Sequence, residues 1–312
     1  IGLPIAIALG ALIGKSEYQL EVLKDSTPEA VEEGKKLIDA QAINIGLKYG
    51  IEEKLYIEII CEAEGKKATA IISGGHTHFV YVARGEEVLV NKQTNASSDA
   101  STEDVELTLR KVYDFAMESP VDELKFILET RNLNKKAAER SFQGNYGHQL
   151  GKTLNSKKNE NLMMGDNTFT HILSYTSAAC DARMAGAMIP VMSNSGSGNQ
   201  GITATLPVVV YAEDNHKSEE ELTRALALSH LTVIYIKQSL GRLSALCGCV
   251  VAATGSSCGI TYLMGGGYEQ VTYAVKNMIA NITGMICDGA KPSCALKLTS
   301  GVSTDRKSTR LN

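Results

Sequence analysis

The second half of the chain contains long runs of apolar and small residues that offer no polar face to water. One of them, LTRALALSHLTVIYIKQSL, follows a capping box formed by Ser218 and Glu221, which predicts a helix that begins there. A helix that is apolar on all sides has to be buried, so several such helices must pack on one another. We therefore predict that residues 167–304 form a unit of buried helices.

The first half of the chain has a different pattern. A Thr-Pro-Glu sequence at residues 27–29 is typical of a helix start, and the apolar positions that follow predict a helix from Pro28 to Lys48. Alternating apolar and polar residues predict a small antiparallel β-unit near residues 54–90, within the bounds 51–98, in which Cys61 packs. The expected fold class is α+β, with mainly buried apolar helices beside this β-unit.

The two ends of the sequence raise separate expectations. The opening run IGLPIAIALGALIG is shorter than the roughly 20 residues that a bilayer requires, so we expect a buried helix and no membrane partner. The chain starts without Met inside this run, and we expect residues 1–304 to be a fragment of one longer protein. Residues 305–312, DRKSTRLN, turn abruptly polar and basic, and we predict a foreign tail.

Composition excludes several classes of function. The formal net charge is −4 and no long stripe of Lys and Arg occurs, so we expect no nucleic-acid partner. Seven cysteines without a preceding secretory segment favour a reducing, cytoplasmic compartment over a disulfide framework. Neither the dinucleotide-binding GxGxxG after a strand nor the P-loop pattern is present, and no phosphate cup for pyridoxal phosphate surrounds a lysine.

The cysteines gather in two glycine-bearing stretches near the C-terminus. LCGC contains Cys247 and Cys249, and CDGAKPSC contains Cys287 and Cys294. Free cysteines are often simply buried, so packing is one interpretation. The spacing does not match paired zinc ligands. Three cysteines could instead hold an iron–sulfur cluster with one iron left open as a Lewis acid, and spacing alone does not choose between these interpretations.

Three stretches carry a resemblance to a known family: MSNSGSGNQGITATLPV, GRLSALCGCVVAATGSSCGITYLMGG and VKNMIANITGMICDGAKPSCALKLTSGVST. They resemble the L-cysteine desulfidase family, which is related to the α-subunit of the bacterial iron–sulfur L-serine dehydratases. The resemblance implies a [4Fe–4S] cluster as cofactor, with Cys247, Cys287 and Cys294 as its ligands. Cys249 is the rival for the first position. Cys180 and Cys258 are left as structural residues.

The resemblance also directs attention to a polar loop before an apolar helix. Backbone N–H groups and hydroxyls at such a helix start can bind a carboxylate, although a loop of this composition is often only a turn. We take the following residues of the loop as substrate-binding candidates: Ser193, Asn194, Ser195, Gly196, Ser197, Gly198 and Asn199. Arg242 is a second candidate for the carboxylate. His76, which shares a strand face with His78, could line the active site.

The expected reaction follows from the resemblance. L-Cysteine is converted to pyruvate, ammonia and sulfide by β-elimination. The family's proposed base lies in a Gly-Cys-Thr-Glu-Pro stretch that this sequence lacks, so the catalytic base is expected upstream of Ile1. Alternatives are an L-serine dehydratase and a non-catalytic protein that binds a cluster or an amino acid. The expected partner is a small-molecule amino acid, and a homo-oligomer stays open.

Overall fold

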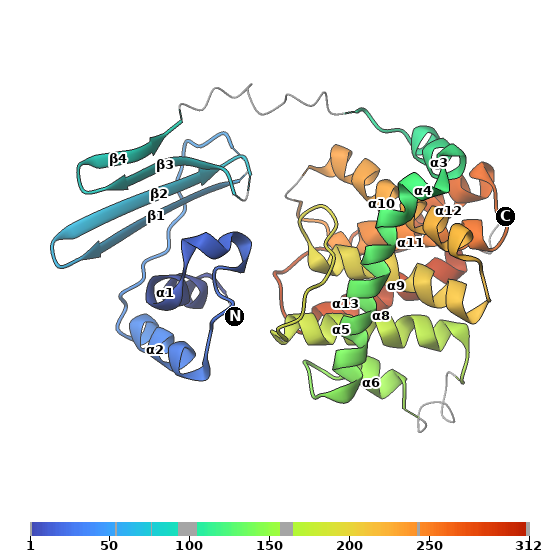
Figure 1. Cartoon of the computed structure of the whole chain (residues 1–312), viewed down its shortest axis with the longest axis horizontal. Coiled ribbons are helices and arrows are strands. Elements are labelled where there is room, and N and C mark those ends of the chain that lie inside the picture. Colours follow the sequence, from blue (N-terminus) through green and yellow to red (C-terminus); the bar gives the residue numbers. More distant parts are fainter. Residues whose placement is uncertain are drawn as a thin grey trace. The chain divides into compact units, whose positions relative to one another are not determined.

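The computed structural model describes residues 2–53, 55–75, 77–92, 105–156, 165–241 and 244–309. The chain divides into two compact units, Ile1–Asp104 and Val105–Asn312 (Figure 1). The first combines helices with one sheet, and the described part of the second is helical. The predicted α+β class is confirmed.

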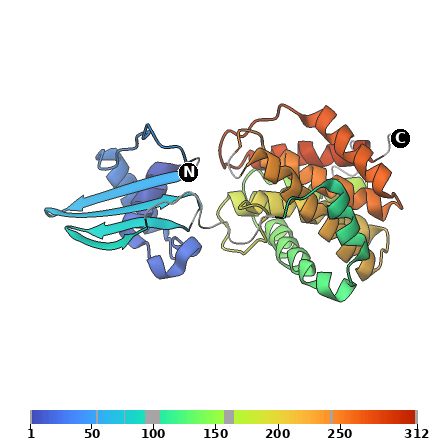
Figure 2. The same cartoon turned by 90° about the horizontal axis from the view of Figure 1, so that it is seen from above.

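The first unit has two helices that pack on each other and a four-stranded sheet (Figure 2). Its elements are α1 (Leu3–Ile13), the 3-10 helix η1 (Ser16–Glu21), α2 (Pro28–Asp39), β1 (Tyr56–Ala63), β2 (Lys66–Ser73), β3 (Phe79–Arg84) and β4 (Glu87–Asn91). The strands form an antiparallel meander in the order β1-β2-β3-β4, which confirms the predicted β-unit.

Three expectations for the first unit need correction. Cys61 is exposed on β1 and does not pack in a core. The opening helix α1 is buried only in part, since Leu3 and Leu12 are exposed. Helix α2 ends at Asp39, well before Lys48.

The early end of α2 has a local cause. Gln41 adopts the left-handed conformation with φ of 54°, and the next N–H, of Ala42, donates to the carbonyl oxygen of Leu37 at 3.0 Å. This is the Schellman arrangement that closes a helix. The sequence does not predict this helix end, because glycine is the usual residue at the left-handed position and here it is Gln41.

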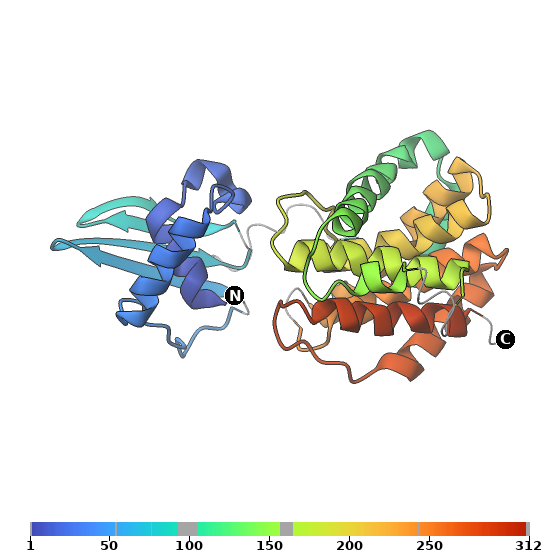
Figure 3. The same ribbon diagram turned by 90° about the horizontal axis from the view of Figure 1, so that it is seen from below.

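The second unit is a bundle of helices. Its elements are α3 (Leu109–Glu118), α4 (Val121–Leu124), η2 (Lys125–Ile127), α5 (Leu128–Gln143), α6 (Leu150–Leu154), α8 (Thr168–Met184), α9 (Gly198–Asp214), α10 (Glu219–Leu240), α11 (Gly248–Leu263), α12 (Tyr268–Ile282) and α13 (Cys294–Ser308). Helix α11 contacts α9, α10, α12 and α13, and α13 runs beside α8 (Figure 3). The capping box predicted at Ser218 and Glu221 is present at the start of α10.

Small residues let these helices approach closely. A Cβ atom at Gly255 of α11 would stand 2.5 Å from the carbonyl oxygen of Ser229 on α10, and one at Gly259 would stand 2.8 Å from that of Ala225. No other residue type fits there without moving a backbone. The glycines lie four apart and so share one face of α11, and the close contact follows from their spacing.

Helix α13 continues past the predicted boundary at residue 304, and the carboxyl group of Asp305 is buried and accepts a hydrogen bond from Ser256 at 2.6 Å. Within the described ranges no helix combines the length and apolar character that crossing a membrane requires.

Candidate functional site

Four helix ends meet where the candidate cysteines lie. Helix α8 ends near Cys180, and α9, α11 and α13 begin at Gly198, Gly248 and Cys294. Cys180, Cys247, Cys249 and Cys294 pack in or against one cluster with the apolar residues around them. We call this region, together with Cys287, the cysteine end of the helical unit. Three helix N-termini there give it a positive electrostatic potential.

A short backbone pairing joins the two cysteine stretches. Leu246 and Ile286 form an isolated antiparallel bridge, and the N–H groups of Cys247 and Cys287 donate across it at 2.9 and 2.8 Å. Residues on either side of a bridge pair share a face, so Cys247 and Cys287 are diagonal neighbours with Cα atoms about 7–8 Å apart. The structure thus brings together two stretches that are well separated in the sequence.

Charged side chains hold the loop between Cys287 and Cys294. The ammonium group of Lys297 donates to the carbonyl oxygen of Ile286 at 3.1 Å and also pairs with Asp288. Lys291 pairs with the same carboxylate at 2.6 Å. These contacts place the positive charge of Lys297 beside the cysteines, where it stabilises a thiolate.

The thiols of the CGC pair differ in acidity. The pKa of Cys247 is lowered because the Cys249 thiol hydrogen-bonds to its sulfur, and the N–H groups at the start of α11 and the charge of Lys297 act in the same direction against burial. The pKa of Cys249 is raised by that same hydrogen bond and by burial. Burial also raises the pKa of Cys180. The thiolate is the form that binds a metal, and the N–H groups at the start of α11 and the charge of Lys297 favour it at Cys247.

The residues fit an iron–sulfur cluster in donor chemistry and in neighbourhood. Among the described residues no three His, Cys, Asp or Glu side chains converge closely enough to hold a single metal ion. A cluster spreads its ligands over separate irons, so its cysteines need not meet at one point. Cys247, Cys287 and Cys294 would hold it, with Cys249 as the rival of Cys247 for the first position.

The predicted substrate loop reaches the same end of the unit. Ser193, Ser195 and Gly196 are exposed, whereas Asn194, Gly198 and Asn199 are buried. The hydroxyl of Ser197 caps α9 by accepting from the N–H of Gln200 at 3.4 Å. A Cβ atom at Gly248 would stand 2.8 Å from the Gln200 side chain, so the start of α9 touches the start of α11 beside Cys247.

A buried polar network fixes this loop, and sequence analysis missed it. The amide of Asn194 donates to Nδ1 and to the carbonyl oxygen of His230 at 3.0 and 3.1 Å, and His230 Nε2 lies 2.9 Å from the hydroxyl of Thr205. Asn134 accepts from the N–H of Met192 and donates to Thr205. Burial lowers the pKa of His230 to about 4, so the ring is neutral and can accept from Asn194.

Arg183 is a further residue that sequence analysis missed. Its guanidinium lies in the last turn of α8 and donates to the amide oxygen of Asn199 at 3.1 Å. A Cβ atom at Gly198 would stand 2.3 Å from Arg183 Nε, so the glycine leaves room for this side chain. The signal available in the sequence was weak, because an arginine in the last turn of a helix commonly serves only the helix dipole.

His76 and Arg242 fall outside the described residues, so their predicted roles stay predictions. Cys258 is fully buried in a different cluster of the unit. It lies eleven positions after Cys247, or roughly 16 Å along α11 at about 1.5 Å per residue.

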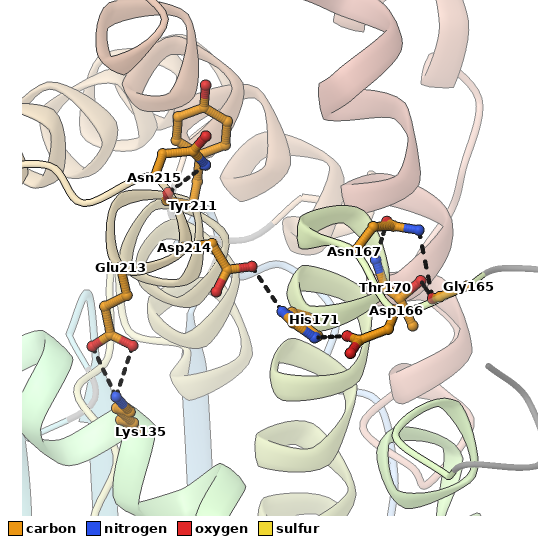
Figure 4. Close-up of polar contacts among 10 residues, drawn as sticks. All are labelled: Lys135, Gly165, Asp166, Asn167, Thr170, His171, Tyr211, Glu213, Asp214 and Asn215. Atoms are coloured by element: carbon orange, nitrogen blue, oxygen red, sulfur yellow. Dashed lines mark hydrogen bonds and ion pairs between the residues drawn. The ribbon is translucent and has the colours of Figure 1, made fainter.

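The other ends of α8 and α9 carry a second polar group, shown in Figure 4. His171 contacts Asp214 through Nδ1 at 2.7 Å and Asp166 through Nε2 at 2.6 Å, and Lys135 pairs with Glu213 at 2.7 Å. Partial burial disfavours the charged ring, but the hydrogen bonds to both carboxylates outweigh it and raise the pKa of His171. We call this region the paired end.

Comparison with known proteins places the chain in a family. A family model described as the serine dehydratase alpha chain matches residues 17–312. A UPF0597 protein of Phocaeicola vulgatus is 81% identical over 304 residues, which are 97% of this chain and 70% of that protein. A UPF0597 protein of Bacteroides fragilis is 78% identical over 304 residues, 97% of this chain and 71% of that protein.

A more distant relative, the UPF0597 protein of Clostridium perfringens, is 42% identical over 302 residues, which are 96% of this chain and 70% of that protein. The family model and these relatives cover both the loop at Ser193 and the cysteine stretches. The chain belongs to the UPF0597 family, which is related to the serine dehydratase alpha chain.

Proposed function

We propose that the chain is the cluster-binding part of an iron–sulfur-dependent carbon–sulfur lyase that converts L-cysteine to pyruvate, ammonia and sulfide by β-elimination. The observation that supports this most is the backbone bridge beside Cys247 and Cys287, which gives both cysteines one face, with Cys294 at the start of a neighbouring helix. The proposed cofactor is a [4Fe–4S] cluster held by these three cysteines.

The chain's own residues divide the remaining work. When bound, the cluster would supply a Lewis-acidic iron with an open coordination position. Lys297 balances the negative charge of the thiolates, and the start of α9 provides N–H groups for a substrate carboxylate. The proposal assigns no general base among the described residues.

L-Serine is the second candidate substrate, and the description of the matching family favours it. The two reactions differ only in the leaving group, hydroxide for serine and sulfide for cysteine. Sulfide is the softer ligand for iron. The described residues bind the part of the amino acid that both substrates share.

Anaerobic reconstitution followed by iron and sulfide analysis tests the cluster. We expect the wild-type chain to retain iron and to show the electron paramagnetic resonance signal of a reduced cluster. Replacement of Cys247, Cys287 or Cys294 by Ser should remove that signal, whereas Cys249→Ser should keep it. Cys61→Ser on the exposed face of β1 is the control and should match the wild type. An iron-free wild-type chain would overturn the proposal and favour a non-catalytic, amino-acid-binding role.

The substrate is decided on the same preparations. L-Cysteine and L-serine are titrated against the absorption spectrum of the cluster, and released sulfide and pyruvate are measured. Sulfide release from L-cysteine, or a spectral change at lower L-cysteine than L-serine concentration, supports the desulfidase. Pyruvate from L-serine without sulfide from L-cysteine would assign the dehydratase instead.

A further inference from the structure

Arg183, in the last turn of α8, and Gln200, in the first turn of α9, carry polar groups that the described residues leave without a charged and a hydrogen-bonding counterpart, respectively. Arg183 donates through Nη1 to neutral acceptors only, the amide oxygen of Asn199 and the sulfur of Met184. No Asp or Glu within the described ranges forms an ion pair with it. Gln200 is 94% buried, since 6% of its surface is exposed, and its Oε1 atom has no hydrogen-bond partner among the residues described.

Neither feature is what folding alone would favour. A buried carbonyl oxygen without a donor costs about 1–3 kcal/mol, and such acceptors are rare in native proteins. An arginine at the end of a helix usually finds a carboxylate or extends into water, whereas the Arg183 side chain lies against Gly198 at the start of another helix. A ligand that carries both a negative charge and a hydrogen-bond donor would therefore satisfy the two groups.

Both groups belong to the first turn of α9 or lie against it. Arg183 lies against Gly198 and Asn199, and Gln200 is the third residue of the same helical turn. A Cβ atom at Gly248, which directly follows Cys247, would stand 2.8 Å from the Gln200 amide. A guanidinium and a buried acceptor beside one helix N-terminus complement a carboxylate and an ammonium that share one carbon atom.

We propose that Arg183 binds the α-carboxylate of an α-amino acid and that Gln200 Oε1 accepts a hydrogen bond from its α-ammonium group. This rests on the proposed function, because it supplies the recognition of that substrate. Both contacts are to groups common to L-serine and L-cysteine. The pair therefore selects α-amino acids as a class and does not distinguish the hydroxyl from the thiol leaving group.

The test compares three ligands by isothermal titration calorimetry on the anaerobically reconstituted 312-residue chain. L-Serine carries both groups, L-serinamide lacks the carboxylate, and 3-hydroxypropionate lacks the ammonium. We expect the wild type to bind L-serine about tenfold to a hundredfold more tightly than either analogue, which is the range for hydrogen bonds to charged groups.

The variants separate the two contacts. Arg183→Gln should remove the preference for L-serine over L-serinamide and keep the preference over 3-hydroxypropionate. Gln200→Met, which has a similar volume but no strong acceptor, should do the opposite. Arg183→Lys should restore part of the carboxylate preference. Arg140→Gln is the matched control, because the exposed side chain of Arg140 donates to the hydroxyl of Tyr146 and lies on α5, away from the start of α9 in the sequence.

Circular dichroism on each variant confirms that the fold is kept. The inference fails if Arg183→Gln and Gln200→Met both retain the wild-type ratios, or if the wild type does not distinguish the three ligands. Iron content is measured on the same samples. If the chain binds iron but the variants keep the wild-type affinity ratios between L-serine and its analogues, only the roles of Arg183 and Gln200 are contradicted. If the chain is iron-free but shows the expected ratios, only the cluster is contradicted.

Discussion

The two ends of the α8–α9 helix pair both carry polar groups, but two side chains at the cysteine end lack, within the described part of the chain, the partners that the charges of the paired end have. At the paired end, His171 and Lys135 each lie against carboxylates of the same chain. At the cysteine end, Arg183 and Gln200 lack such partners among the described residues, and the thiols stand free of disulfides. A charge paired within the chain stabilises the fold, whereas Arg183 and Gln200 are the groups to which the amino-acid ligand is assigned above.

Asn134→Ala should have the largest effect on stability. Its side chain is fully buried and binds Met192, Gly201 and Thr205, so truncation leaves several buried groups without partners. We expect a loss of about 3 kcal/mol in the free energy of unfolding, measured by urea denaturation. Asn132→Ala on the same helix is the control, because Asn132 contacts only exposed Glu129 and should change stability by less than about 0.5 kcal/mol. Equal losses in both variants would contradict the network.

The buried histidine should make the cysteine end sensitive to acid. The pKa of His230 is lowered by burial from 6.5 to about 4 in the folded chain, so the unfolded chain binds more protons between these values. Stability should therefore fall as the pH drops from about 6.5 to 4, by about 3 kcal/mol in all. Urea denaturation at each pH measures it. His230→Gln should flatten this dependence, and an unchanged acid slope in that variant would count against the assignment.

The histidine at the paired end should act in the opposite direction. The pKa of His171 is raised in the folded chain, so its contribution is present below pH 6.5 and is lost as the pH rises through the raised value. We expect a smaller effect than for His230, because the ring is 36% exposed. Thermal unfolding between pH 5.5 and 8, compared with His171→Gln, measures it. A contribution that grows with rising pH would contradict the sign.

The smallest effect is expected for Lys135 and Glu213. Their side chains are 30% and 42% exposed, so the ion pair is largely solvated. A double-mutant cycle with Lys135→Ala and Glu213→Ala should give a coupling of about 0.5 kcal/mol that decreases at high salt. A coupling above 2 kcal/mol would show that the paired end contributes more than a solvated surface can.

The sequence predicted much of the fold because the decisive signals were local. Apolar runs and the capping box at Ser218 predicted helices that the structure contains, and alternation near residues 54–90 predicted the sheet. The end of α2 was missed because Gln41 adopts the left-handed conformation, which glutamine rarely does. Helix ends depend on single residues and are therefore harder to predict than helices themselves.

The site was predictable only in part, for a different reason. The cysteines and the loop at Ser193 are marked by their composition. The partners that position them are not, because Asn134, His230 and Thr205 come together only through packing of α5, α9 and α10. No local sequence pattern marks any of the three as part of a site. Contacts between residues far apart in the chain are the part that single-sequence reasoning does not reach.

The bridge between Leu246 and Ile286 affects what a proteolytic cut between α11 and α12 would do. It fastens the residues before α11 to those after α12, so the two helices form a closed loop. A protease that cuts the exposed turn at Gly265 would open the loop at its far side and leave the fastened ends untouched. The fragments would stay joined by packing and by the bridge, and Cys247 and Cys287 would remain neighbours in a chain cut in two.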